Sequence, residues 1–234
     1  HNTAFGKGAG DAITTASNNT AFGSHSLGST TTGASNVAVG REAMFSNTTA
    51  SNNIGIGYQA LYANTTGTSN VAVGSLALDA NTTGSRNTSL GYKALTTATT
   101  NDNTAIGADA LELNTTGGQN VAVGSQAADA NTTGSSLVAI GYNALSTNTT
   151  ASDNTAVGQS ALRDNTTGTY NTGLGKSALQ SNTTADNNTA VGRNALTSNT
   201  TGAQNTAVGS EALDAGNHSN CNAFGYQALS ANTT

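Results

Sequence analysis

A period of 17 residues runs through the whole chain and constrains its fold more than any other feature. The repeated unit reads Asn-Thr/Val-Ala-Val/Ile/Phe-Gly-x-x-Ala-Leu-x-x-Asn-Thr-Thr-Gly-x-x. Fourteen glycines mark it, from Gly6 to Gly225, at steps of 17 except for two steps of 16 that end at Gly107 and Gly225. A fixed period of this size is typical of stacked repeats, in which one unit cannot bury its apolar residues alone. We therefore expect about fourteen stacked coils.

The segment before each marker glycine predicts a short strand. The residue next to the glycine is always apolar, as in Phe22, Val39 and Ile56, and the one before it is Ala, Gly or Ser. Side chains alternate across a strand, so large apolar and tiny residues fall on opposite sides. A helix is disfavoured because Asn-Thr-Thr-Gly interrupts the chain every 17 residues.

A second apolar segment follows the glycine in each unit, usually Ala-Leu, as in Ala60-Leu61 and Ala161-Leu162. It predicts a second short strand and a second buried wall in each coil. The fold class is therefore all-β, a parallel β-solenoid or β-roll of about fourteen 17-residue coils. Residues 1–234 form a single repeat array with no internal domain boundary. Because the sequence begins and stops inside a repeat, we interpret it as a fragment or processed segment of a fibre.

Composition excludes several classes of protein. Only 8% of residues are charged, the net charge is −5, and there is no Pro, which disfavours the high-charge, Pro-rich profile of disordered chains. Seven basic residues are too few for a nucleic-acid surface. No apolar run approaches the length of a membrane span. Cys221 is the single cysteine, so it is expected as a small buried residue, with an interchain disulfide as the alternative.

Two asparagine columns carry the candidate structural and modification sites. The strand-opening Asn is expected to form a buried ladder in which each amide bonds to the copies above and below. Leu137 and Cys221 replace it, and Leu137 should interrupt the ladder while burying apolar surface. The ladder residues are Asn2, Asn19, Asn36, Asn53, Asn70, Asn87, Asn103, Asn120, Asn154, Asn171, Asn188 and Asn205.

The second column begins each Asn-Thr-Thr segment. Its residues are expected in turns, which Asn and Thr favour, and they also match the N-glycosylation acceptor pattern. Both interpretations stay open. The two short repeats lose a residue after the Thr pair, at Asn101-Asp102 and Ser219-Asn220. The candidate glycosylation residues are Asn47, Asn64, Asn81, Asn114, Asn131, Asn148, Asn165, Asn182, Asn199 and Asn232.

Catalysis needs a convergent set of nucleophile, base and orienting group, and the repeat offers none. His1, His25 and His218 fall in different coils, and His218, in a turn, is expected at the solvated surface. Three carboxylates, Asp79, Asp129 and Asp214, share one column but not adjacent coils. We predict no catalytic residue, no cofactor and no metal site.

Units such as Asn36-Val-Ala-Val-Gly40, Asn103-Thr-Ala-Ile-Gly107 and Asn120-Val-Ala-Val-Gly124 resemble the head repeats of trimeric autotransporter adhesins, and the longer unit is similar to repeats in tail-fibre-like proteins. The resemblance covers the whole chain. It implies a left-handed β-roll, three chains side by side, and a location outside the cell, at its surface or on a virion tail. The adhesin unit is shorter, and the extra residues here fall in the Asn-Thr-Thr-Gly region.

Self-association is also expected from the residues, because both strand faces carry apolar or tiny side chains. We predict a homotrimer or filament that acts as a rigid extracellular fibre or adhesin segment, with a host-surface or glycan receptor as a further partner. The alternative is an ice-binding solenoid that uses its Thr and Asn arrays. A lesser alternative is the receptor-binding segment of a phage tail fibre.

Overall fold

The computed structural model describes residues 1–231. Contacts within the chain divide it into two compact units, His1–Gly118 and Gln119–Thr234. The first unit contains β1 (Thr3–Phe5), β2 (Thr20–Phe22), β3 (Val37–Val39), β4 (Ile54–Ile56), β5 (Val71–Val73), β6 (Thr88–Leu90) and β7 (Thr104–Ile106). The second contains β8 (Val121–Val123), β9 (Val138–Ile140), β10 (Thr155–Val157), β11 (Thr172–Leu174), β12 (Thr189–Val191), β13 (Thr206–Val208) and β14 (Asn222–Phe224).

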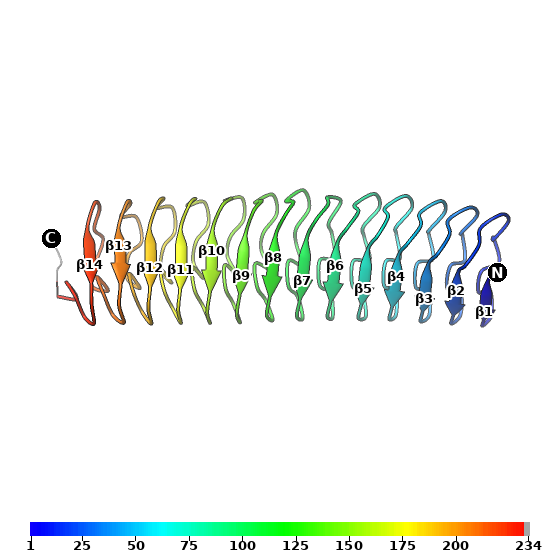
Figure 1. Ribbon diagram of the computed structural model, residues 1–234, viewed down its shortest axis with the longest axis horizontal. Coiled ribbons are helices and arrows are strands. Elements are labelled where there is room, and N and C mark those ends of the chain that lie inside the picture. The colour runs from blue at the N-terminus through cyan, green and yellow to red at the C-terminus, as the bar shows by residue number, and fades with distance from the viewer. Residues whose placement is uncertain (232–234) are drawn as a thin grey trace. The chain divides into compact units, whose positions relative to one another are not determined.

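Each unit is a parallel β-solenoid in which successive strands pair in chain order (Figure 1). The pairing always joins equivalent repeat positions: Ala4 lies opposite Ala21, and Ala156 lies opposite Gly173. The predicted all-β solenoid is confirmed, as is the predicted strand before each marker glycine. The 17-residue period fixes this pairing because a shift by one residue would place the large apolar side chains inside the coil.

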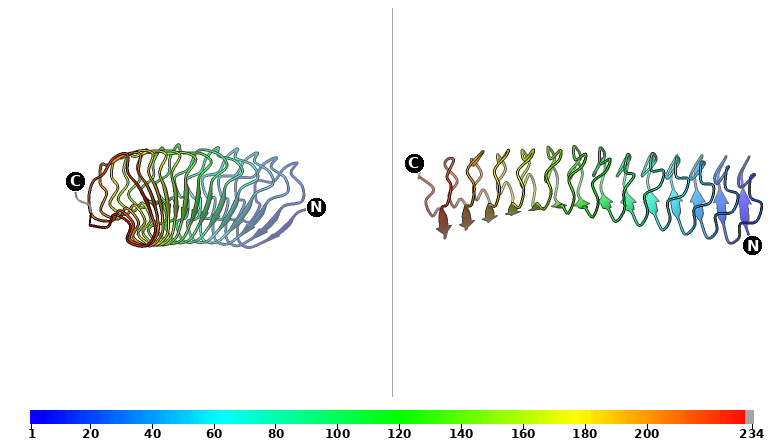
Figure 2. Two further views of the ribbon diagram at one scale, coloured as in Figure 1. Left: turned by 60° about the vertical axis from the view of Figure 1, so that its left-hand side comes forward. Right: turned by 90° about the horizontal axis from the view of Figure 1, so that it is seen from above.

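The tiny residue of each strand points into the coil, and its two large neighbours point out. Ala38, Ala105 and Ala156 are buried, whereas the residues on either side of them are half-buried or exposed. Figure 2 shows that within each unit the strands follow one side of the coils, while the rest of each repeat closes the other sides. The interior is therefore thin and is filled by small side chains.

The Ala-Leu segment forms the opposite wall of the interior, as predicted. Leu61, Leu162 and the equivalent leucines from Leu27 to Leu213 are fully buried, Met44 takes the same place in its coil, and Leu229 in the last described coil is 48% exposed. The backbone N–H of Met44 donates to the carbonyl of Ala60 in the next coil at 2.9 Å. The segment thus joins adjacent coils as well as filling them.

The second predicted strand is wrong: over residues 1–231 each repeat has one strand and there is no helix. The reason lies in the backbone of the Ala-Leu segment. Leu61 has a φ of 54° and Gln59, two residues earlier, has a φ of 55°, so both adopt the left-handed conformation and a strand cannot form. None of the described elements is therefore a long apolar helix of the kind that crosses a membrane.

The marker glycine is required by both backbone angle and contact. Gly158 has a φ of +134°, a conformation that side-chain-bearing residues rarely adopt. A Cβ atom there would lie 2.5 Å from the carbonyl oxygen of Gly175 in the next coil. Only glycine lets the chain turn at this point and still stack closely.

Candidate functional site: asparagine ladders, an outward strand face and one aromatic pocket

The strand-opening asparagines are buried from Asn19 onward, while Asn2 is exposed. The side chain of Asn36 spans its own coil, donating from Nδ2 to the carbonyl of Ala50 at 2.9 Å. Its Oδ1 accepts the backbone N–H of Asn53 in the next coil at 3.0 Å. The opening column thus bonds mainly from amide to backbone rather than from amide to amide, and it ties adjacent coils together.

Leu137 interrupts the opening column and is fully buried among its neighbours, at 1% exposure. Its backbone N–H still donates to Oδ1 of Asn120 at 2.9 Å. The carbonyl of Ala151, which an opening Asn would otherwise contact, accepts Nδ2 of Asn148 at 3.0 Å. The Asn-Thr-Thr column thereby supplies a hydrogen bond to the Ala151 carbonyl, to which the Leu137 side chain cannot donate.

The amide-to-amide ladder lies in the Asn-Thr-Thr column. All of its described members, from Asn47 to Asn199, are fully buried. Nδ2 of Asn165 donates to Oδ1 of Asn148 at 3.1 Å and to the carbonyl of Gly168 at 2.9 Å. Nδ2 of Asn182 in turn donates to Oδ1 of Asn165 at 2.8 Å. Within a run of regular repeats, each amide therefore closes its own turn and joins the coil before it.

Burial makes the described Asn-Thr-Thr amides inaccessible to glycosylation once the coils have formed. A glycan would be attached to the amide nitrogen of an Asn-x-Thr asparagine, and in the described members of this column that nitrogen is inside the coil and hydrogen bonded. An acceptor in this position is reachable only before its coil forms. Asn232 lies outside the described residues.

The ladder stops at the two 16-residue repeats. Oδ1 of Asn81 and Oδ1 of Asn199 are buried without a hydrogen-bond partner. The equivalent positions in the next coils hold Ala98 and Gly216, which have no side-chain amide to donate. A shorter repeat thus leaves one unsatisfied acceptor in the coil before it.

Hydrogen bonds also locate the missing residue. Nδ2 of Asn70 donates to the carbonyl of Gly84 in a regular repeat. In the short repeats the corresponding acceptors are the carbonyls of Thr100, at 2.7 Å from Asn87, and of His218, at 2.5 Å from Asn205. Thr100 and His218 therefore occupy the place of the Gly or Ala that follows the Thr pair. The deletion falls within the Asn-Thr-Thr-Gly turn, slightly earlier than expected.

The expected surface position of His218 is wrong, because this place faces the interior and His218 is 4% exposed. Cys221 was expected to be buried but is half-exposed. It stands in the opening column of the last described coil, where a neighbouring coil covers it on one side only, whereas the buried members of the column have a coil on both sides.

The two threonines of each Asn-Thr-Thr segment have different roles. Oγ1 of Thr48 donates to the carbonyl of Thr65 in the next coil at 3.2 Å, and Oγ1 of Thr166 donates to that of Thr183 at 3.0 Å. The second threonine is exposed in several coils, as at Thr49 and Thr184. The hydroxyl of the first threonine is thus used between coils in several of these turns.

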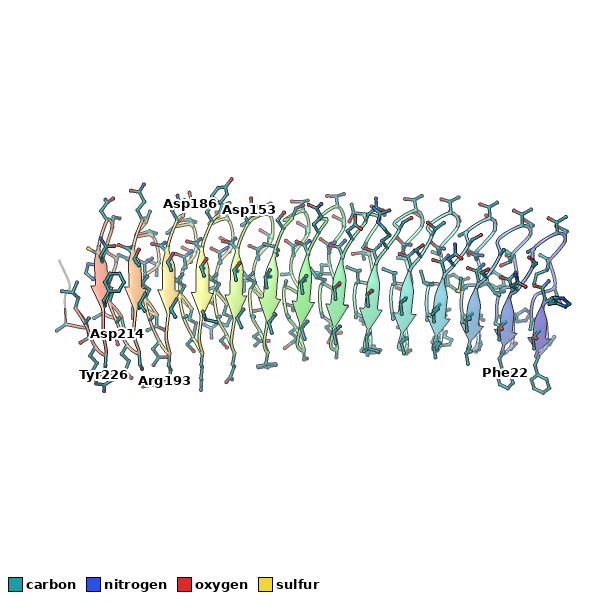
Figure 3. The ribbon with its side chains drawn as sticks, in the orientation of Figure 1. Phe22, Asp153, Asp186, Arg193, Asp214 and Tyr226 are labelled. Atoms are coloured by element: carbon teal, nitrogen blue, oxygen red, sulfur yellow. The ribbon has the colours of Figure 1, made fainter. Side chains whose placement is uncertain are left out.

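The outward strand face consists of the first and third residue of every strand. These positions hold only Thr, Val, Ile, Leu, Phe and one Asn, and no charged residue. Leu90 and Leu174 are each 45% exposed. Phe5 and Phe22 stack with ring centroids 5.1 Å apart, and Phe22 points away from the coil (Figure 3).

Charged residues lie elsewhere, mostly in turns and in exposed pairs. Arg86 contacts Asp102 at 2.6 Å, and the guanidinium holds the pKa of that carboxyl below its usual range. Figure 3 shows Asp153 and Asp186 at one end of the coils and Arg193 and Tyr226 at the other. Among residues 1–231 no three His, Cys, Asp or Glu side chains gather closely enough to hold a metal ion.

A small pocket with a volume of about 260 Å³ opens in the first unit, lined by His25, Glu42, Phe45 and Tyr62. These residues come from three consecutive repeats. Sequence reasoning did not identify the pocket. The available signal was Phe45 and Tyr62 themselves, which are the aromatic residues of a column that elsewhere holds small, polar or charged side chains.

No protein-family model matches the chain, and no curated protein matches it.

Proposed function

We propose that the chain is a structural segment of a self-associating extracellular fibre or adhesin, displayed on a cell or virion surface or assembled into a filament. The observation that carries this proposal is the outward strand face. The third residue of every strand on this face is apolar, with Phe5, Phe22 and Phe224 exposed by more than half, while the first residue is Thr, Val, Ile or Asn. Apolar surface arranged in a continuous patch is typical of protein interfaces.

The partner that best fits this face is a second copy of the chain. A copy carries the same uncharged strand face with the same spacing between coils, so apolar files meet apolar files without burying a charge. The absence of charge on the face removes the like-charge repulsion that would otherwise oppose pairing of identical surfaces. A homotrimer or a longer filament would use this contact repeatedly.

The hydrogen bonds within each unit suit a stiff spacer. Buried Asn side chains link coil to coil in two columns, and the backbone of the Ala-Leu segment adds a third connection. Each coil depends on its neighbours in this way, as in other solenoids. We infer that the chain holds attached partners at a fixed distance.

Sedimentation and electron microscopy of the purified chain test the proposal. We expect oligomers or filaments, and we expect Leu174→Lys to weaken them because it places a charge on the strand face. Thr184→Lys is the matched control, since it adds the same charge to an exposed turn of the same repeat. A chain that sediments as a stable folded monomer at every concentration, or equal effects of both variants, would refute the proposed interface.

A second candidate function is ice binding, for which β10–β13 provide a specific observation. Thr155, Thr172, Thr189 and Thr206 begin four successive strands on the outward face. They form a regular file beside a file of Val and Leu. Measurement of thermal hysteresis decides this candidate, and the absence of hysteresis removes it.

A further inference from the structure

The pocket formed by the segments that follow β2, β3 and β4 lies where the repeat departs from its pattern. The residue after the buried Leu is usually small, polar or charged, but Phe45 and Tyr62 occupy it in two consecutive repeats. Nearby, His25 and Glu42 stand two residues after their marker glycines. A ligand site needs a local departure of this kind, because a uniform repeat offers the same surface everywhere.

Glycines in neighbouring repeats make room for two bulky side chains of one repeat, the pocket residue Phe45 and the buried Met44. A Cβ atom at Gly28 would lie 2.9 Å from Cε2 of Phe45, and one at Gly55 would lie 2.7 Å from Cγ of Met44. Most repeats carry Ala where Gly55 stands and a residue with a side chain where Gly28 stands. The glycines therefore create the room that the bulky side chains of this region occupy.

Ring stacking fixes the apolar wall of the pocket. The rings of Phe45 and Tyr62 are parallel within 10°, with centroids 5.6 Å apart. His25 meets Phe45 edge to face, with centroids 6.4 Å apart and planes at 77°. Such arrangements are favourable for aromatic pairs, so the wall is preorganised before any ligand arrives.

Glu42 provides the polar side of the pocket and is held in place. Its Oε2 accepts Nε2 of Gln59 at 2.8 Å, and its Oε1 accepts Nε and Nη2 of Arg41 at 3.1 and 3.0 Å. The Gln59 hydrogen bond and then the Arg41 hydrogen bond lower the pKa of Glu42. Since a carboxylate oxygen has two lone pairs, Oε2 can accept one more donor.

We propose that this pocket binds one ring of a neutral saccharide. Sugar hydroxyls would donate to Oε2 of Glu42 and bond to the Tyr62 hydroxyl and the His25 imidazole, while sugar C–H groups would pack against the rings of Phe45 and Tyr62. The volume of about 260 Å³ lies just below the range of pockets for drug-sized ligands, which suits a single ring. A cation is the weaker match because Arg41 already balances the charge of Glu42.

This inference rests on the proposed function for its meaning, since it names the chemical class of receptor that an adhesive fibre would contact. Binding itself does not require self-association. The two ideas can therefore fail separately: loss of saccharide binding leaves sedimentation unchanged, and a monomeric chain can still bind sugar.

The experiment is saturation-transfer NMR and titration of the full chain with the methyl glycosides of glucose, galactose, mannose and N-acetylglucosamine. Phe45→Ser and Tyr62→Ser are the test variants, because Ser146 and Ser230 hold the same column elsewhere and show that Ser is compatible with the coil. We expect at least one glycoside to bind saturably, and each variant to weaken it about tenfold, as expected for loss of an aromatic contact.

Glu211→Gln is the matched control. Glu211 also accepts Nε2 of a following glutamine, Gln227, at 2.9 Å and pairs with an arginine, Arg193. Its repeat has Asp214 where Phe45 stands, so it reproduces the polar group without the aromatic wall. We expect Glu42→Gln to weaken binding and Glu211→Gln to leave it unchanged.

Three results would overturn the proposal: none of the four glycosides binds, the Phe45→Ser variant binds as tightly as the parent chain, or tetramethylammonium binds at this pocket while the glycosides do not.

Discussion

Two stretches of the chain have the same kind of strand but different interiors. One holds Asn148, Asn165 and Asn182, and the other holds Asn81 and Ala98. In the first, amides bond to one another through consecutive 17-residue repeats. In the second, the 16-residue repeat supplies Ala98, and Oδ1 of Asn81 has no partner. Strand pairing is in register in both places.

The comparison separates two requirements of a solenoid. Strand stacking needs the tiny residue, the marker glycine and the buried Leu, which the short repeats retain. The Asn-Thr-Thr ladder is an additional set of bonds that a repeat can lose without unfolding. Since an unmade buried hydrogen bond costs about 1–3 kcal/mol, we expect coils beside the short repeats to open more easily than those within a continuous ladder.

The largest expected effect comes from breaking the continuous ladder. Asn165→Ala removes the donor to Oδ1 of Asn148, the donor to the carbonyl of Gly168 and the acceptor for Nδ2 of Asn182. We expect a loss of about 2–4 kcal/mol in the free energy of local opening. Hydrogen exchange of peptides that cover residues 145–185, followed by mass spectrometry, measures it.

The control for this variant is Asn199→Ala at the end of a ladder. Asn199 donates to Oδ1 of Asn182 at 3.4 Å and to the carbonyl of Gly202, but its own Oδ1 accepts nothing. Its loss should cost about 1 kcal/mol less than that of Asn165. Equal losses would show that the bond Asn165 accepts from Nδ2 of Asn182 adds nothing to the two bonds that its own amide donates.

The next effect comes from repairing the ladder at a short repeat. Ala98→Asn places an amide opposite the unsatisfied Oδ1 of Asn81, and we expect a gain of about 1 kcal/mol in local stability. Gly216→Asn, its counterpart beside Asn199, should instead lose about 1–3 kcal/mol, because Gly216 has a φ of 141°. Exchange protection around each site measures both changes, and a destabilised Ala98→Asn variant would contradict the ladder geometry.

The sequence predicted the solenoid because the fold depends mainly on which residues recur and how far apart they are. The strands, their register and the buried Leu wall follow from the 17-residue period and the tiny-apolar alternation. The second strand was mispredicted because Leu61 and its equivalents look like strand residues in composition, while their left-handed backbone is imposed by closing the coil.

The hydrogen-bond partners of the two asparagine columns could not be predicted from the sequence. Both columns hold Asn at the same period, and nothing in the residue types indicates which amides will meet each other across coils. The structure assigns amide-to-backbone bonds to Asn36 and amide-to-amide bonds to Asn165. The pocket was missed because Glu42 and Tyr62 meet only after the coils stack, although the aromatic residue in an otherwise small or polar column was visible.

A smaller effect on stability, which depends on pH, is expected from Asp79 in the coil before the first short repeat. Partial burial raises the pKa of Asp79, a half-buried side chain whose Oδ1 is covered and has no hydrogen-bond partner. The folded chain therefore binds this proton more tightly than the unfolded chain, so the contribution of Asp79 to stability is greatest at low pH. It is lost as pH rises from the unfolded value of about 3.9 through the raised folded pKa.

We expect Asp79→Asn to be more stable than the parent chain at neutral pH and equal to it below the unfolded pKa. Thermal unfolding monitored by circular dichroism across this range measures the difference. Asp109→Asn in the first unit is a control carboxylate for the change of net charge. A difference between Asp79→Asn and the parent chain that does not vary with pH would refute the burial argument.

The smallest expected effect concerns the exposed pair that joins the short repeat to the coil before it. Arg86 contacts Asp102 at 2.6 Å, and both side chains are more than 40% exposed. The lowered pKa of Asp102 means that the pair stabilises the chain above the unfolded carboxyl pKa and stops doing so as pH falls through the folded value.

Asp102→Asn keeps a residue that tolerates the local φ of 64°, so only the charge is removed. We expect a slight decrease in melting temperature at neutral pH and low salt, smaller than for any variant above. The decrease should vanish in high salt, because exposed ion pairs are screened; a decrease that persists in salt would mean that Asp102 supports the shortened turn through hydrogen bonding rather than charge.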